Sequence, residues 1–192
     1  MAANRRARAR TIRLYIIAAV LALLVGAGGL AVFGLFLQTG IEANSHLAAA
    51  VGDYDRDNLP AAERELRTAL SIKADLYDAR FDLAIVLLKE GRYAAALAEL
   101  RRAEGIKELA TAHLYAGVAD LAMHRPDLAR DEARAGLAQV GQDPDIDALL
   151  ATADRQLGHA ASAEQEYATA RSEGYQGQTV RDWIAQAALT QD

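Results

Sequence analysis

The sequence contains no cysteine and only four histidines, at positions 46, 113, 124 and 159. The absence of cysteine excludes a disulfide framework, a cysteine-ligated zinc site, a thiol nucleophile and a lipid-modified cysteine. The chain also lacks a phosphate-binding loop, a dinucleotide fingerprint, a His-Glu-x-x-His pair and a nucleophile elbow. We therefore expect no catalytic residues, no cofactor and no metal, and so a protein that is not an enzyme.

Two weaker patterns do not change the expectation that no metal is bound. His113, Asp120 and His124 could share one helix face, but His124 falls in a predicted turn. Asp53, Asp55 and Asp57 alternate as in a calcium loop, yet the required glycine and the closing glutamate are missing. A solvated acidic turn explains the aspartates better.

Acidic residues are missing from the N-terminal part of the chain. Residues 1–41 hold five arginines and no acid, whereas residues 42–192 hold the other 16 basic and all 26 acidic residues, which gives −10. A nucleic-acid-binding protein needs a basic face on its folded part. The acidic folded part therefore argues against nucleic acid as a partner.

A long apolar run follows the five arginines. Leu14–Leu37 contains no charged residue and, at about 1.5 Å per residue, spans roughly 36 Å, more than the hydrocarbon core of a membrane. We predict a basic tail at 1–13, a transmembrane helix at 14–38 and a short linker at 39–42. A cleaved signal peptide is the alternative, but the run is long for one and no convincing cleavage site follows it.

The arginines before this run set the expected topology, because positive charge is retained in the cytoplasm. We expect a single-pass protein of the bacterial inner membrane, with its N-terminus cytoplasmic and its repeats periplasmic. The alanine- and arginine-rich composition is typical of a GC-rich bacterial genome, although an organelle protein with a signal anchor is an alternative. Small residues form a candidate face for packing against a neighbouring transmembrane helix: Ala18, Ala22, Gly26 and Gly34.

The remainder of the chain repeats at intervals of 34, 33 and 34 residues. These intervals separate the alanines that open the second helix of each unit: Ala62, Ala96, Ala129 and Ala163. Each is preceded by a short polar or glycine-containing break, at Asp57-Asn58, Gly91-Arg92, His124-Arg125 and Gly158-His159. The pattern predicts an all-α solenoid of four helix pairs over residues 43–176, closed by a capping helix at 178–190.

These repeats resemble the tetratricopeptide repeat (TPR) family. Repeat two matches best, through Leu83-Ala84, Gly91-Arg92-Tyr93, Ala96, Leu100 and Ala103. In the first helix of each TPR unit, a large residue precedes a small one, here Leu83-Ala84 in repeat two, and bulky aromatic residues usually flank these two. The residues before them in this chain are instead His46, Arg80, His113 and Asp147. After the pair come Asp53, Leu87, Asp120 and Asp154.

In TPR proteins the first helix of each pair lines a concave surface. The resemblance implies a protein-binding groove here, formed by Leu47, Val51, Tyr54, Phe81, Ile85, Leu88, Leu114, Val118, Leu121 and Arg155. Some members bind a chaperone carboxylate through a combination of Lys, Asn and Arg residues, which this set, with Arg155 as its single basic residue, does not provide. An amphipathic helix or an extended apolar segment suits it better. Alternatively, these side chains pack between neighbouring helices and bind nothing.

The sequence thus predicts a membrane-anchored TPR scaffold that binds protein partners on the periplasmic side. We expect an accessory subunit of a multi-subunit inner-membrane complex, and the alternative is a transient assembly factor or chaperone-like adaptor. A recruiter of envelope polymers is a weaker hypothesis, because no aromatic and polar surface suited to saccharides is evident.

Overall fold

The computed structural model describes residues 29, 32, 37–172, 174 and 182, and the chain divides into two compact units, Met1–Glu42 and Ala43–Asp192. The predicted transmembrane helix and capping helix lie almost entirely outside the described residues, and the basic tail lies wholly outside them. Residues 37–42, which include the predicted linker, are helical. No helix within the described part of the chain is long and apolar enough to cross a membrane.

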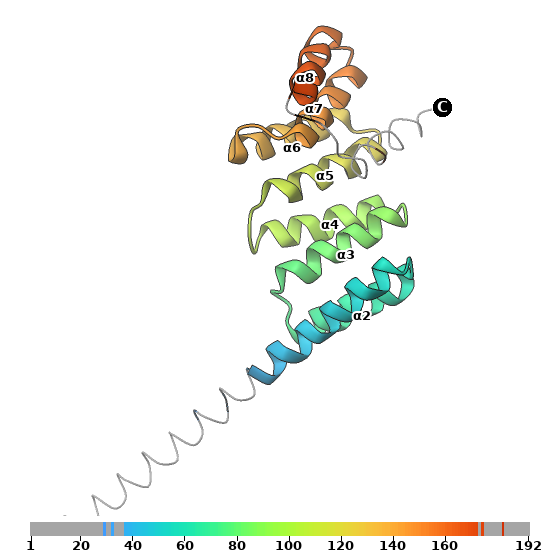
Figure 1. The fold of residues 1–192 in the computed structure, drawn as a ribbon, viewed down its shortest axis with the longest axis vertical. Helices are drawn as coiled ribbons and strands as arrows, with labels where there is room; N and C mark the ends of the chain where they lie inside the picture. Colours follow the sequence, from blue (N-terminus) through green and yellow to red (C-terminus); the bar gives the residue numbers. More distant parts are fainter. Residues whose placement is uncertain (1–28, 30–31, 33–36, 173, 175–181, 183–192) are drawn as a thin grey trace, which may run out of the picture. The chain divides into compact units, whose positions relative to one another are not determined.

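The second unit is a stack of helix pairs, and its described residues contain no strand (Figure 1). Residues 43–55 are helical and precede α2 (Leu59–Ile72). The later helices are α3 (Tyr77–Lys89), α4 (Tyr93–Glu104), α5 (Ala110–Ala122), α6 (Pro126–Val140), α7 (Pro144–Gln156) and α8 (Ala160–Ser172). Each helix from α2 to α8 packs against the next one, and α5 also contacts α7. The predicted all-α solenoid of helix pairs is therefore confirmed.

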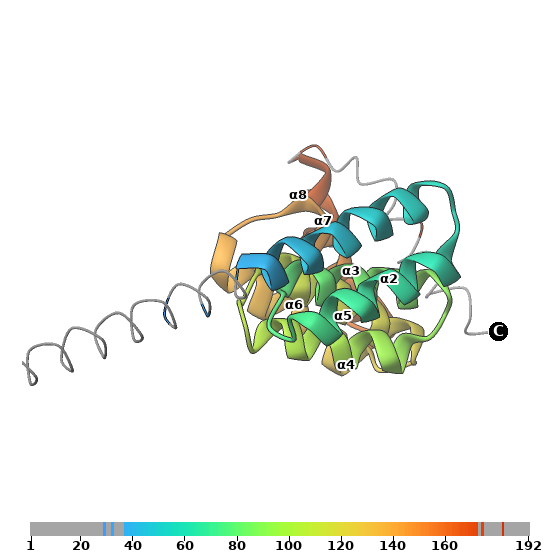
Figure 2. The same ribbon diagram turned by 90° about the horizontal axis from the view of Figure 1, so that it is seen from below.

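Figure 2 looks along this stack, so that the helices lie one behind another. Four turns of one kind join the two helices of each pair. Asp57, Gly91, His124 and Gly158 all have a positive φ, between 57° and 82°. This left-handed conformation ends a helix and is easiest for glycine. It falls in all four breaks that the sequence predicted.

The backbone hydrogen bonds of these turns explain how each first helix ends. The amide that follows the left-handed residue donates to the carbonyl five residues earlier, at 2.8–2.9 Å, in all four pairs. This is the bond of a Schellman motif, which satisfies one of the free carbonyls at a helix end. The carbonyl belongs to Asp53, Leu87, Asp120 or Asp154, and the three aspartates stand where the TPR pattern has an apolar residue.

The aspartates at these positions pair with basic side chains in or near the same turn. Asp53 lies 2.9 Å from Arg56 and Asp120 lies 2.6 Å from Arg125. Asp154 lies 3.1 Å from His159. Ion pairs at the end of the first helix thus occupy the place of an apolar side chain in three of the four repeats.

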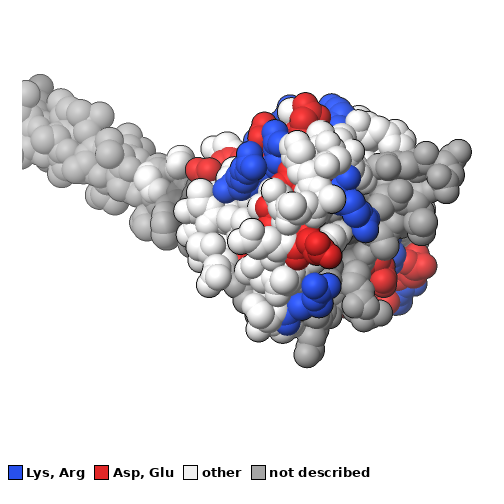
Figure 3. All heavy atoms as spheres, turned by 90° about the horizontal axis from the view of Figure 1, so that it is seen from above, with Lys and Arg blue, Asp and Glu red and all other residues white. Residues whose placement is uncertain are grey.

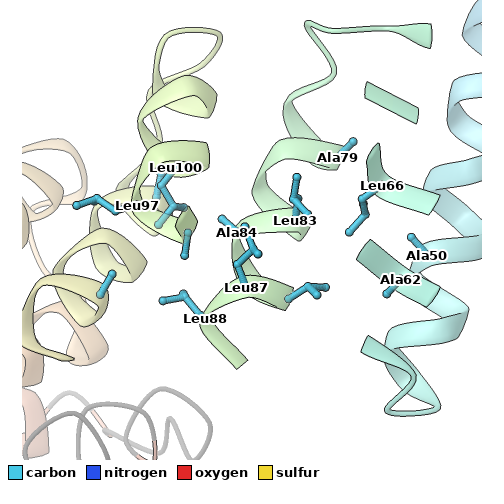
Figure 4. Packing of buried hydrophobic residues seen from close by; sticks show 14 of the residues in the cluster. Ala50, Ala62, Leu66, Ala79, Leu83, Ala84, Leu87, Leu88, Leu97 and Leu100 are labelled. Carbon is cyan, nitrogen blue, oxygen red and sulfur yellow. The ribbon is translucent and has the colours of Figure 1, made fainter. Parts of the chain in front are cut away.

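Small residues allow the helices of the stack to approach closely. The four alanines of the repeat are 0–3% exposed, and Leu66, Leu87 and Leu100 fill the space between them. Figure 4 shows this packing, in which leucines and alanines from neighbouring helices point toward one another. The buried residues of the first two repeats form one cluster, which extends to α5, and those of α5–α7 form a second.

Candidate functional site

The predicted groove residues occupy three equivalent positions on the first helix of each pair. Leu47, Phe81 and Leu114 share the first position, and Val51, Ile85 and Val118 share the second. The third position is held by Tyr54, Leu88, Leu121 and Arg155. Their exposure differs along the stack.

An apolar cavity of about 140 Å³ lies between the helix at residues 43–55 and α3. Three of the predicted groove residues line it: Val51, Tyr54 and Ile85. Its other lining residues are Ala50, Leu66, Asp82 and Val86. The structure therefore brings together groove residues from repeats one and two around one concave site.

Aromatic rings extend this apolar surface along the stack. Phe81 stacks on Tyr77 with ring centroids 5.8 Å apart, and its ring meets the edge of Tyr115 at 5.5 Å. Leu47 and Phe81 are half-buried and pack against the first core cluster. At the other edge of the cavity, Lys89 lies 4.7 Å above the Tyr54 ring and 2.7 Å from Asp57.

Asp82 is the charged residue in the cavity wall. Burial, together with the nearby charge of Asp78, raises the pKa of Asp82 to about 6. No hydrogen bond or ion pair to its carboxylate is found among the residues that the structure describes. An uncompensated carboxylate in an apolar cavity favours an occupant that brings a positive charge or a hydrogen-bond donor.

The groove positions of repeat three are buried instead. Leu114 is 5% exposed, Val118 is 2% exposed, and Leu121 is fully buried. All three belong to the second core cluster, with side chains of α7. In repeat two, Leu88 is buried as well, at 5% exposed. These placements match the alternative interpretation, in which the side chains pack between neighbouring helices. Partner binding at these positions stays a prediction.

The last groove position is polar and exposed. The guanidinium of Arg155 lies 5.8 Å from the Tyr167 ring centroid. The Tyr167 hydroxyl is 2.8 Å from the hydroxyl of Thr152, which occupies the repeat-four position equivalent to Val51. Repeat four therefore has polar, internally bonded side chains where repeat one has apolar ones.

A second cluster of functional groups lies where α4, α5 and α6 meet. His113 Nδ1 is 2.8 Å from Glu132 Oε2 and 3.5 Å from Glu104 Oε1. Burial lowers the pKa of His113, but its hydrogen bond to Glu132 and the charges of both glutamates outweigh burial and raise it. For Glu104, burial has the opposite effect and raises the pKa, and the charge of Glu132 raises it further. One imidazole and two carboxylates could hold a divalent cation.

Sequence reasoning named His113 but not its partners. It considered Asp120 and His124, which share the chain segment of His113, whereas the glutamates come from the helices on either side. The available signal was a regular spacing, because His46 pairs with Glu65, Arg80 with Glu99 and His113 with Glu132, each across 19 residues.

Charges of both signs are interspersed on the described surface in Figure 3. Acidic and basic side chains lie close to each other on this face, with uncharged surface between them. Elsewhere on the described surface, ion pairs join neighbouring repeats, as between Arg92 and Glu63 at 2.6 Å. This face presents no broad basic area of the kind that binds nucleic acid.

No protein-family model and no curated protein sequence matches the chain. Among solved structures it is similar to MamA, with a TM-score of 0.65 and 15% identity over 77% of this chain and 88% of MamA. A second MamA structure, from AMB-1, gives 0.62 and 17% identity over 69% and 74%.

A mutant O-GlcNAc transferase of Thermobaculum terrenum is similar over a smaller part of its length. Its TM-score is 0.56 at 20% identity, over 60% of this chain but only 22% of the transferase. At these identities the likeness shows the fold alone, which is a TPR-like solenoid of helix pairs.

Proposed function

We propose that this protein is a non-enzymatic scaffold that binds a segment of a partner protein in the concave site between its first two repeats. The apolar cavity lined by Val51, Tyr54 and Ile85 carries this proposal. Val51 is 46% exposed, so it is available to a partner in the described structure. Solenoids of helix pairs commonly bind partners on such concave surfaces.

The chemistry of the cavity specifies the kind of segment that fits it. Apolar side chains of an amphipathic helix would bury the exposed apolar surface. A lysine or arginine on the same segment would pair with the Asp82 carboxylate, which has no such partner among the described residues. The partner segment is therefore apolar on one side and carries a basic residue beside that side.

Anchoring is part of the proposal and rests on the sequence. The apolar run at 14–38 would hold the scaffold in the bacterial inner membrane, with the face of Ala18, Ala22, Gly26 and Gly34 against a neighbouring helix. The repeats would then lie on the periplasmic side. Confinement to one membrane raises the effective concentration of the scaffold toward partners in that membrane.

Within this function, we favour a resident accessory subunit of a multi-subunit membrane complex. A transient assembly factor or chaperone-like adaptor would use the same concave site and the same anchor. The two differ in stoichiometry, because a resident subunit stays with one fixed set of proteins through gentle solubilisation.

The test is co-purification of the tagged full-length protein from native membranes, with a matched pair of variants. Val51→Glu places a charge in the concave site, and Val140→Glu makes the same change at an exposed valine near the end of α6. Both valines are about half exposed, at 46% and 51%, so both variants should fold.

We expect Val51→Glu to lose the co-purified proteins and Val140→Glu to retain them. Equal retention by both variants would contradict binding at the concave site. Mass spectrometry of the retained set then separates the two roles. A fixed stoichiometry supports the resident subunit, whereas many substoichiometric clients support the transient factor.

A further inference from the structure

The cluster around His113 differs from the equivalent pairs in the other repeats. In repeats one to three, a basic residue of the first helix contacts a glutamate of the second helix at 2.6–3.0 Å. Such a pair has a simple structural role, since it joins the two helices of one repeat. Only in repeat three do further carboxylates converge on the basic group, among the residues that the structure describes.

Glu104 is the unusual member of the cluster. It lies eight residues after Ala96, the repeat alanine of α4, and the residues eight positions after the corresponding alanines in repeats one and three are Leu70 and Leu137. Both leucines are partly buried and pack against the cores, so a glutamate here gives up apolar packing. Its Oε1 atom is buried and makes no hydrogen bond in the described structure, although it lies 3.5 Å from His113 Nδ1.

Two carboxylates compete for one ring nitrogen of His113 in this cluster. The single Nδ1–H of His113 can donate a good hydrogen bond to only one carboxylate, and Glu132, at 2.8 Å, is nearer than Glu104. Glu104 is left as a second carboxylate beside Glu132, and its buried Oε1 atom has no hydrogen bond in the described structure.

The geometry is close to that of a three-residue metal site. Its three ligand atoms lie within 4.8 Å of one another, and two of their separations are 2.8 and 3.5 Å. Zinc bonds of about 2.0–2.2 Å place tetrahedral ligand atoms about 3.4 Å apart. Small side-chain movements would therefore bring His113, Glu104 and Glu132 to ligand distances.

The other ring nitrogen of His113 supports this arrangement. Its Nε2 lies 3.5 Å from Glu108 Oε1. A histidine that binds a metal through one nitrogen usually donates the other N–H to a carboxylate or carbonyl, which fixes the tautomer and the ring orientation. The His113 ring is 8% exposed, so the surrounding helices already hold it in place.

We propose that His113 Nδ1, Glu104 and Glu132 bind a divalent transition-metal ion such as zinc, with Glu108 orienting the imidazole. The ion would join α4, α5 and α6, and so would connect repeat two to repeat three. This site is separate from the concave cavity, and its existence does not depend on the proposed scaffold function.

The test is zinc binding by the purified full-length protein, stripped of metal with a chelator and titrated at pH 7.5 in competition with a zinc indicator. We expect one zinc ion per chain and a higher thermal unfolding temperature with zinc. Glu104→Leu introduces the residue found at the equivalent place in repeats one and three, so the variant should fold. It should lose more affinity than the roughly 10- to 100-fold typical of removing an outer-shell group.

Two further variants separate this site from other zinc binding. Glu108→Gln should weaken zinc binding by about tenfold, as expected for a group that only orients a ligand. Glu65→Gln removes the repeat-one equivalent of Glu132, beside His46, and should leave the affinity unchanged. Unchanged affinity in Glu104→Leu, or an equal loss in Glu65→Gln, would overturn the proposal. Circular dichroism confirms that each variant is folded.

Discussion

The first two repeats and the last two use the second groove position, that of Val51, in opposite ways. In repeats one and two, the positions of Val51 and Ile85 are accessible and line a cavity. In repeats three and four, the equivalent Val118 and Thr152 are 2% and 1% exposed. One sequence pattern therefore gives an open concave surface in one half of the stack and a packed core in the other.

The two halves also differ in the polarity of what they bury. All five buried polar or charged residues among the described part of the chain lie in α5 and α7: His113, Asp120, Asp147, Thr152 and Asp154. The core of the first half is made of alanine, leucine and valine. Buried ionisable groups need partners, and those partners fix the geometry of the second half. The first half therefore combines an apolar core with the open cavity.

The largest expected effect comes from truncating one groove residue in each half. Leu121→Ala removes a fully buried side chain and should cost about 2–5 kcal/mol of unfolding free energy, because it leaves a cavity. Val51→Ala removes a side chain that is 46% exposed and should change stability by less than about 0.5 kcal/mol. Urea unfolding followed by circular dichroism measures both, and similar losses would remove the distinction between the halves.

A smaller effect is expected from adding a methyl group to one glycine in each half. A Cβ at Gly117 would lie 2.5 Å from Leu149 Cδ2 and 3.3 Å from the Ala129 carbonyl oxygen. Gly117→Ala should therefore destabilise the fold by about 1–3 kcal/mol, despite the better helix propensity of alanine.

Gly52→Ala is the matched control in the first half. A Cβ there would meet only the Arg56 guanidinium, at 3.6 Å or more. Alanine should stabilise the helix at residues 43–55 by up to about 1 kcal/mol, because glycine is the poorer helix former. Thermal unfolding compares the two variants, and a stable Gly117→Ala protein would show that α5 and α7 can separate at little cost.

The order of helices and turns along the chain was predictable, because local conformational preferences determine where each helix ends. The breaks at Gly91-Arg92 and Gly158-His159 follow from the freedom of glycine at positive φ. The repeat then extended the prediction to Asp57 and His124, which adopt the same conformation without being glycine. Periodicity therefore compensated for weak local signals.

The difference in exposure between the halves was not predictable from the same pattern. Val51 and Val118 are identical residues at equivalent positions, yet only one is accessible. Their exposure depends on how closely the neighbouring helices approach, and hence on residues such as Gly117. The cluster at His113 escaped prediction for a related reason, since its glutamates come from the neighbouring helices α4 and α6 and meet His113 only through helix packing.

The smallest expected effect concerns the carboxylate in the open cavity. Asp82 has a folded-state pKa of about 6 against an ordinary value of 3.8, so the folded state binds this proton more tightly than the unfolded state. The contribution of Asp82 to the free energy of unfolding should therefore fall as pH rises from about 4 to about 6. The whole pKa shift, if fully expressed, would correspond to about 3 kcal/mol. Because the side chain is partly exposed, we expect about 1 kcal/mol.

Asp82→Asn tests this expectation. The amide cannot ionise, so the variant should be more stable than the wild type by about that amount at pH 7.5, and the two proteins should differ little at pH 4. Urea unfolding at the two pH values measures the difference. If the stability difference between the wild type and the variant were the same at both pH values, the Asp82 carboxylate would be solvated or paired in solution. The open cavity would then lose the negative charge that specifies a basic partner segment.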